Sequence, residues 1–204
     1  MTETEIENVV AGLVEQAERR FYGKYRGIVA DNEDPAGLGR LRVKVPSVLG
    51  PDVVTGWATP CLPYGGAAGQ GLVFVPERQA HVWVEFEEGD LEFPIWVGVY
   101  WNKGDMPEPA TVGPRPTKKI VSTVKGHTLE FEDADGKESV TLREGGQGHT
   151  VTMDSDGIKI IDATGNAVEL TRTEMNLIAK TPLTINAAGM PVKIICSALA
   201  LVRG

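Results

Sequence analysis

The feature that most constrains this chain is a repeat of short apolar pairs in its second half. In each pair, two apolar residues stand at positions i and i+2, which places both side chains on one face of a strand. Successive pairs begin 11, 11, 7, 10, 7, 8 and 9 residues apart, and turn-forming residues such as 133–136 and 154–157 lie between them. The pairs are Leu129/Phe131, Val140/Leu142, Val151/Met153, Ile158/Ile160, Val168/Leu170, Met175/Leu177, Leu183/Ile185 and Val192/Ile194.

Each unit of this repeat supplies one strand, one turn and only two inward apolar side chains. A single-chain solenoid normally spends roughly 20 or more residues on each coil, so one copy of this tail would leave its apolar stripe in water. Three copies around a threefold axis would each supply one wall of a prism, with the stripes meeting at the centre. The alternative is a flat sheet or sandwich, because the short offsets also fit a meander.

We therefore predict a parallel homotrimer whose tail has no stable monomeric fold. The predicted trimer core is Leu129, Phe131, Val140, Leu142, Val151, Met153, Ile158, Ile160, Val168, Leu170, Leu177, Leu183 and Ile185. The end of the chain, from about Asn186, is expected to be an apolar tip region.

The aromatic residues divide the chain. Of its thirteen Phe, Trp and Tyr residues, only Phe131 lies beyond residue 103, so a bulky globular core belongs to the first half. Four prolines between residues 104 and 119 indicate a stiff, extended connector. The sequence thus predicts an N-terminal helix at 1–21, a barrel at 22–103, a proline-rich linker at 104–119 and a β-helical spike with its tip at 120–204.

Short strands with intervening turns are predicted throughout the first half. The candidate strands are residues 22–30, 40–45, 53–59, 71–75, 81–86 and 94–100. Since no helical pattern interrupts them, they favour a small closed barrel. Before them, Ile6, Val9, Val10, Leu13, Val14 and Ala17 share one face of a 3.6-residue period, which predicts a helix. That face either packs on its own domain or docks onto a partner chain or a neighbouring subunit.

The barrel pattern, connector and repeat together resemble the baseplate-assembly-V family, the central spike proteins of contractile phage tails, related injection particles and type VI secretion machines. The motifs that carry the resemblance are residues 25–29, 39–46, 57–58, 63–65, 74–76, 82–90, 94–98 and 126–133. The resemblance implies an all-β fold: after the N-terminal helix, a small oligonucleotide/oligosaccharide-binding (OB) barrel, then an intertwined trimeric β-prism or β-helical tail.

The same resemblance implies a structural role. The protein would be made in the cytoplasm and assembled into a phage tail or injection particle, where the trimer at the tube tip pierces the target envelope. Its partners would be its own copies, baseplate hub and tail-tube proteins, a small conical cap and, transiently, the target membrane. Hub docking would involve Ile6, Val9, Val10 and Leu13, and cap docking Pro191, Val192, Ile194, Ile195 and Leu199. The lysozyme insertion and the His-x-His iron site of some relatives are missing here.

No catalytic, cofactor or metal site is predicted, and the chain is not expected to be an enzyme. Its three histidines, His81, His127 and His149, are far apart in sequence, and no motif of a nucleophile, zinc or nucleotide site is present. The pairs Asp133/Asp135 and Asp154/Asp156 lack the further ligands of a calcium loop and fit turns better.

The net charge argues against a second class of function, nucleic-acid binding. An OB barrel could bind single-stranded nucleic acid or a saccharide, and nucleic-acid binding requires a basic groove with aromatic platforms. The whole chain has a net charge of −8, and residues 1–103 hold 9 Lys and Arg against 15 Asp and Glu. We therefore expect no nucleic-acid partner and retain the binding module as the alternative function.

Overall fold

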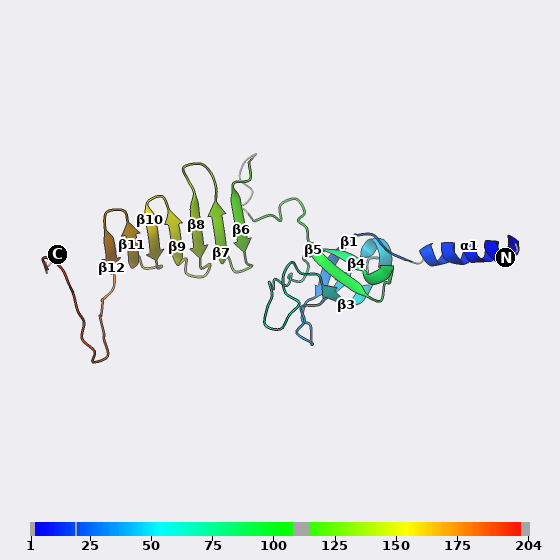
Figure 1. Cartoon of the computed structure of the whole chain (residues 1–204), viewed down its shortest axis with the longest axis horizontal. Helices are drawn as coiled ribbons and strands as arrows, with labels where there is room; N and C mark the ends of the chain where they lie inside the picture. Colours follow the sequence, from blue (N-terminus) through cyan, green and yellow to red (C-terminus); the bar gives the residue numbers. More distant parts are fainter. Residues whose placement is uncertain (1–2, 19, 108–114, 201–204) are drawn as a thin grey trace. The chain divides into compact units, whose positions relative to one another are not determined.

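The computed structural model describes residues 3–18, 20–107 and 115–200. The chain forms two compact units, Met1–Asp105 and Met106–Gly204, each with its own sheet (Figure 1). Part of the predicted linker, residues 108–114, lies outside the described residues.

A closed five-stranded barrel forms most of the first unit, as the alternating sequence pattern predicts. Its strands are β1 (Tyr25–Asp31), β2 (Leu41–Lys44), β3 (Val54–Pro60), β4 (His81–Phe86) and β5 (Pro94–Val99). They follow one another around the barrel in the order β1-β2-β3-β5-β4, with β1 pairing with β4. Two short helical segments, α2 (Pro46–Leu49) and η1 (Glu87–Gly89), connect strands.

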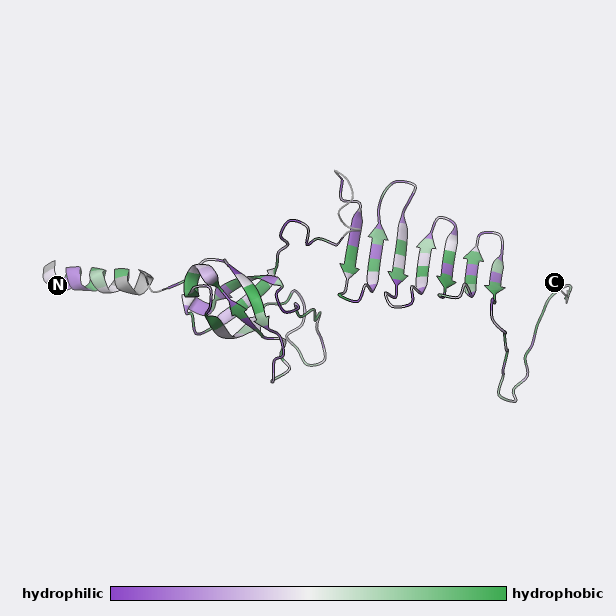
Figure 2. Cartoon of the chain, turned by 180° about the vertical axis from the view of Figure 1, so that it is seen from behind, coloured by the Kyte–Doolittle hydropathy of each residue, from purple (hydrophilic) through white to green (hydrophobic). Residues whose placement is uncertain are grey.

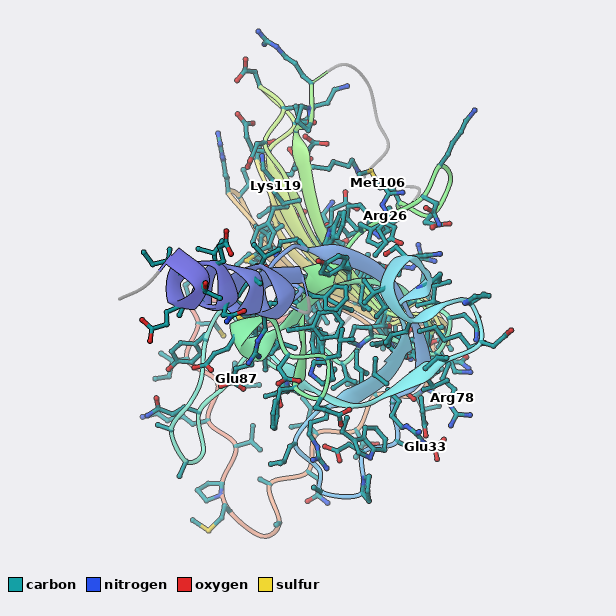
Figure 3. The ribbon with its side chains drawn as sticks, turned by 90° about the vertical axis from the view of Figure 1, so that its right-hand side faces the viewer. Arg26, Glu33, Arg78, Glu87, Met106 and Lys119 are labelled. Carbon is teal, nitrogen blue, oxygen red and sulfur yellow. The ribbon has the colours of Figure 1, made fainter. Side chains whose placement is uncertain are left out.

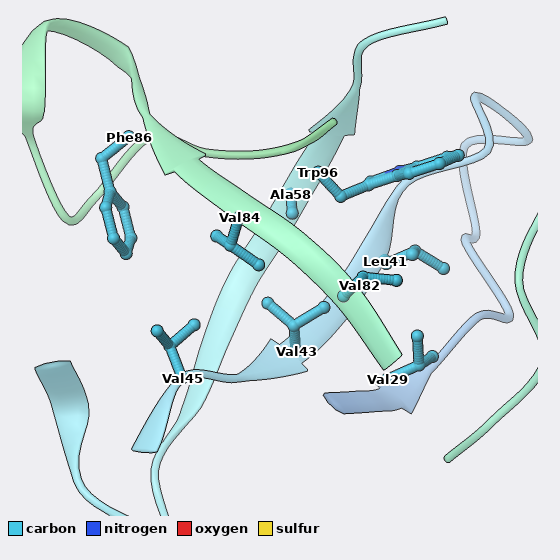
Figure 4. Packing of buried hydrophobic residues seen from close by; sticks show 9 residues of the cluster. All are labelled: Val29, Leu41, Val43, Val45, Ala58, Val82, Val84, Phe86 and Trp96. Carbon is cyan, nitrogen blue, oxygen red and sulfur yellow. The ribbon is translucent and has the colours of Figure 1, made fainter. Parts of the chain in front are cut away.

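Side chains that alternate along these strands fill the barrel (Figure 4). On β4, for example, Val82, Val84 and Phe86 point inward and are at most 5% exposed. Trp96 is 3% exposed and donates its indole N–H to the Gly39 carbonyl at 3.1 Å, so its polar atom is satisfied. The core comprises Val29, Leu41, Val43, Val45, Ala58, Val82, Val84, Phe86 and Trp96.

The predicted strand at residues 71–75 is wrong. This segment belongs to the loop between β3 and β4, where its Leu72 N–H bonds to the Tyr64 carbonyl at 3.1 Å. The barrel closes without it, because β3 and β5 pair directly in parallel at Thr59 with Ile95 and at Pro60 with Trp96. No sheet edge is left for the segment to join, and Val73 and Phe74 remain exposed.

The loop from β1 to β2 is organised by one carboxylate. Asp34 accepts backbone N–H bonds from Ala36, Leu38 and Arg40, and it pairs with the Arg40 guanidinium at 2.6 Å. These interactions, the guanidinium first, hold the pKa of Asp34 well below its usual range. The Asp34 side chain is only 3% exposed, so the loop depends on its ionised form.

The predicted N-terminal helix is confirmed as α1 (Glu3–Glu18). Phe21 follows it, and its N–H bonds to the Gly89 carbonyl at 2.9 Å. Glycine is needed at position 89, because φ is +75° and an added Cβ would lie 2.9 Å from the Phe21 nitrogen.

The second unit is a seven-stranded antiparallel meander in which every strand pairs with its neighbours in sequence (Figure 1). Tight turns rich in Gly and Asp connect the strands, as the repeat predicts. The strands are β6 (Lys118–Ser122), β7 (Thr128–Glu132), β8 (Ser139–Arg143), β9 (Thr150–Asp154), β10 (Gly157–Ile161), β11 (Ala167–Thr171) and β12 (Met175–Ile178).

The repeat ends earlier in the structure than in the sequence. Residues 179–200 form no strand, so the predicted strands at Leu183/Ile185 and Val192/Ile194 are wrong. Pro182 and Pro191, which each precede one of these pairs by one residue, lack the N–H that a ladder requires. At the other end, β6 is an additional strand that the apolar pairs did not predict.

Candidate assembly interface

The strand register places the apolar pairs of β7 to β12 on one face of the second sheet. Val151 on β9, for example, lies opposite Leu142 on β8 and Ile160 on β10. Residues that lie opposite each other on neighbouring strands point to the same side of a sheet. The apolar pairs of β7 to β12, together with Lys119 and Val121 of β6, therefore form two rows across all seven strands. One row is Val121, Leu129, Leu142, Val151, Ile160, Val168 and Leu177; the other is Lys119, Phe131, Val140, Met153, Ile158, Leu170 and Met175. We call these two rows the apolar face.

The opposite face of the sheet is more polar. Hydropathy accordingly alternates along the strands (Figure 2). Lys118 pairs with Glu130 on this side, and Lys159 lies opposite Glu169. Its middle row is Ile120, Glu130, Thr141, Thr152, Lys159, Glu169 and Asn176. The sheet therefore has one side suited to water and one side that is not.

No side chain of the apolar face is buried within a single chain. Leu142 is 54% exposed, Ile160 47% and Leu177 58%, whereas the barrel core residues are at most 5% exposed. Thirteen of the fourteen residues in the two rows are apolar, so they form one continuous patch. A contiguous apolar surface of this kind marks an interface rather than a free surface.

Eleven of the thirteen predicted core residues lie on this face, and Leu183 and Ile185 do not, because they follow β12. Their assignment to a trimer core remains a prediction. The structure adds Val121 and Met175 to the face. Met175 belongs to a recognised pair, but Val121 was missed because the position two residues before it is Lys119, which breaks the apolar pattern.

A repeated hydrogen bond joins successive turns at one end of the strands. His127, His149 and Asn166 each directly precede a strand, namely β7, β9 and β11. The Nδ1 atoms of His127 and His149 accept backbone N–H bonds from Gly145 (3.1 Å) and Ala163 (3.2 Å) in the next turn. Asn166 Oδ1 likewise accepts the Lys180 N–H at 2.7 Å. These two histidines therefore have a structural role within the sheet.

Carboxylates close the same turns. Glu144 accepts N–H bonds from Gly146 and Gln147, each at 2.6 Å, and these bonds lower its pKa. Asp162 accepts hydrogen bonds from the Asn166 amide and the Thr164 hydroxyl, which hold its pKa well below the usual range. An ionised carboxylate with several donors is the expected centre of a tight turn.

Within the part of the chain that the structure describes, no three His, Cys, Asp or Glu side chains gather closely enough to hold a metal ion. The acidic turns behave as turns: Asp154 Oδ1 accepts the N–H bonds of Asp156 (2.9 Å) and Gly157 (3.2 Å). Asp133 instead pairs with Lys119.

Several cations of the barrel are already paired with carboxylates. Lys24 pairs with Glu85 at 2.6 Å, and Arg78 pairs with Asp31 at 2.7 Å. Arg78 also pairs with Glu33 at 3.5 Å, and both of these residues are labelled in Figure 3. The distances in two further pairs are 3.2 Å for Arg20–Asp90 and 2.6 Å for Arg40–Asp34. These pairs hold four of the eight Lys and Arg side chains between residues 20 and 103, which reduces the number of cations open to phosphate groups and weighs against the nucleic-acid alternative.

Residues predicted to dock partners are exposed where the structure describes them. On α1, the exposed fractions are 46% for Ile6, 54% for Val9 and 51% for Val10, while the Leu13 side chain lies outside the described residues. The predicted cap-docking residues Pro191, Val192, Ile194, Ile195 and Leu199 are also exposed. Among described helices, none has the length and apolar character needed to cross a bilayer.

Family models match both units. Residues 25–101 match the type VI secretion system/phage-baseplate injector OB domain, and residues 118–177 match the phage baseplate V C-terminal trimerisation domain. The second match covers the strands that carry the apolar face. No curated protein matches the chain.

Proposed function

This chain belongs to the phage baseplate V family, and we propose from that premise that three copies form the central spike of a contractile injection machine. The family and its trimerisation domain support a homotrimer with a structural role in a baseplate. The specific proposal is that the trimer sits at the tip of the tail tube and pierces the target envelope when the sheath contracts, without catalytic activity of its own.

The observation that carries this proposal is the uncovered apolar face of the second sheet. If three sheets turn this face toward a common axis, each supplies thirteen apolar side chains to one shared core. Strands lie about 4.8 Å apart, so seven of them make a wall roughly 29 Å long. Each wall is only two inward side chains wide, which suits a narrow prism.

Proposed contacts at the two ends of the chain complete this role. The exposed apolar residues of α1 would dock onto a baseplate hub, and the exposed residues between Pro191 and Leu199 would receive a small cap or a cargo. Both segments present more apolar surface than a free end normally exposes.

Tagged particles test the location directly. A strain that produces the particle would have its own copy of this gene replaced by one carrying a short tag after Gly204. Gold-labelled antibody on intact particles, viewed by electron microscopy, should mark the tip of the tube, and mass spectrometry should find about three copies per particle. Label along the sheath, or particles that lack the chain, would contradict the proposal.

Complementation with paired variants links location to the apolar face. Ile160→Asp alters that face, whereas Ile161→Asp makes the same change on the opposite face of the same strand. Only Ile161→Asp should restore labelled, infective or cell-killing particles to a deletion strain. Equal rescue by both variants would show that the apolar face is not the assembly interface.

A further inference from the structure

One patch on the outside of the barrel combines a cation with two aromatic rings. Arg26 on β1 is exposed and lies opposite Trp83 on β4, and its guanidinium carbon is 5.7 Å from the centre of the Trp83 ring. The same carbon is 5.2 Å from the centre of the Tyr100 ring, and the two rings are 4.9 Å apart. These distances are within the range of cation–π contacts, which hold the guanidinium in a defined position. We call Arg26, Trp83 and Tyr100 the cationic patch.

The cationic patch has binding capacity that its own chain does not use. Within the residues that the structure describes, the Arg26 side chain makes no ion pair or hydrogen bond, although a guanidinium carries several N–H donors. On β5, Gly98 lies opposite Trp83 and has no side chain. A Cβ added at Gly98 would meet nothing within 4 Å, so there is room beside Trp83 for a side chain of another molecule. The patch therefore fits a surface that offers a carboxylate next to an apolar or aromatic side chain.

The same barrel carries a surface of that kind just after β4. Glu87 and Glu88 are exposed, and neither carboxylate has an ion pair within the described residues. The Glu87 N–H bonds to the Phe93 carbonyl at 2.9 Å, and Phe93 is 59% exposed. A hollow of about 270 Å³ here is lined by Arg20, Glu87, Glu88, Asp90 and Phe93. We call Glu87, Glu88 and Phe93 the acidic patch.

The two patches lie on different sides of the barrel. In Figure 3, Arg26 lies toward the top of the barrel and Glu87 toward its lower left. Arg26 therefore does not pair with the acidic patch of its own chain. In a ring of identical subunits, each interface joins one surface of a subunit to a different surface of the next. Complementary patches on different sides of one barrel meet that requirement.

We propose that neighbouring barrels of the trimer bind one another, with Arg26 of one copy paired with Glu87 and Glu88 of the next. Phe93 of that next copy would occupy the space beside Trp83. The proposal rests on the trimeric spike proposed above. Because a trimeric tail tethers the three barrels, the contact needs little affinity of its own. Contact between two identical patches would instead bring like charges together.

Disulfide trapping in the full chain tests whether the patches meet. The native thiols, both exposed, are first removed by Cys61→Ser and Cys196→Ser. The test variant then adds Arg26→Cys and Glu87→Cys. The matched control adds Arg26→Cys and Glu33→Cys, because the Glu33 side chain is 80% exposed and lies on another side of the barrel (Figure 3). After mild oxidation in dilute solution, the test variant should run as covalent trimers on a non-reducing gel, and the control mainly as single chains.

Charge reversal gives a second measurement. Arg26→Glu should lower the melting temperature of the barrel, followed by Trp fluorescence, by a few degrees. Glu87→Arg combined with Glu88→Arg should have a similar effect. The chain with all three substitutions should recover most of the loss, since opposite charges would again meet between copies. If Arg26 acted only within its own chain, the triple variant would show no recovery.

The outcomes separate this contact from the spike function. Equal cross-linking of the two cysteine pairs, or no recovery in the triple variant, would overturn the contact between barrels. If light scattering then still shows trimers, the spike proposal is unaffected. A wild-type chain that stays monomeric would contradict the trimer on which both proposals depend.

Discussion

Ile160→Asp is the sharpest perturbation of the apolar face. Ile160 lies near the middle of one row, opposite Val151 on one side and Val168 on the other. Its neighbour Ile161 points to the opposite face, where it lies opposite Thr150 and Ala167. The same substitution at the two positions therefore changes only the face that receives the carboxylate.

The size of the expected loss of trimer stability follows from the burial of Ile160 and of the carboxylate that replaces it. Complete burial of an isoleucine contributes about 1.5–3 kcal/mol, and Ile160 has 47% of its surface still to cover, which corresponds to about 1 kcal/mol per chain. Its loss costs the trimer about 3 kcal/mol. Burying three carboxylates near one axis adds several kcal/mol per ion, or on the order of 10 kcal/mol in total. Since 1.4 kcal/mol is a tenfold change, the two costs together should weaken the trimer by about nine orders of magnitude.

Size exclusion with light scattering measures this effect. One chain has a mass of 21.9 kDa, so wild type and Ile161→Asp should elute as trimers of about 66 kDa. Ile160→Asp should give monomers or aggregates with an unfolded tail. All four Trp residues lie in the first unit, so native Trp fluorescence would show that the barrel is still folded. An Ile160→Asp trimer with an unchanged melting temperature would refute the reasoning.

Three further predictions concern other parts of the chain. Folding lowers the pKa of Asp34, so the stability that its ionised carboxylate gives the barrel is present above the ordinary pKa of 3.8 and is lost as the pH falls below that value. Asp34→Asn should therefore lower the melting temperature at pH 7 and make the melting temperature depend less on pH below about pH 4. His149→Ala should lower the trimer's melting temperature, whereas His149→Asn should largely preserve it, since Asn166 fills the equivalent position; equal losses in calorimetry would contradict this role of the side chain. A chain ending at Ala187 retains the whole apolar face and should stay trimeric by light scattering; a monomer would show that the tip is required.

Much of the fold could be predicted because its two units obey simple periodicities. Alternation of apolar and polar residues predicts the strands around Leu41, Val82 and Trp96, and the i, i+2 pairs predict β7 to β12 with the paired side chains on one face of the sheet. These signals depend only on neighbours along the chain, so one sequence is enough to read them.

The errors arise where pairing partners decide the structure. Residues 71–75 have a strand-like composition, yet β3 and β5 meet directly and leave them no edge. Residues after Ile178 keep the apolar spacing but gain prolines in front of each pair. Likewise, Val121 becomes visible as part of the apolar face only when its register with Leu129 is known. The bonds from His127 and His149 to the next turn join residues at least 14 apart, and local pattern does not reveal them.

The meander has a consequence for how long such a tail can be. Every strand pairs only with the strands before and after it, so a hairpin adds about 9.6 Å to the stack without altering the layers already present. Each hairpin also returns the chain to the same ends of the strands, and the i, i+2 pairs keep their apolar side chains on the same face of the sheet. Turn lengths can vary freely, as the offsets of 7 to 11 residues show. The length of the sheet is therefore set by the number of hairpins, and a duplicated segment such as β9–β10 would lengthen the sheet while its width along the strands stays constant.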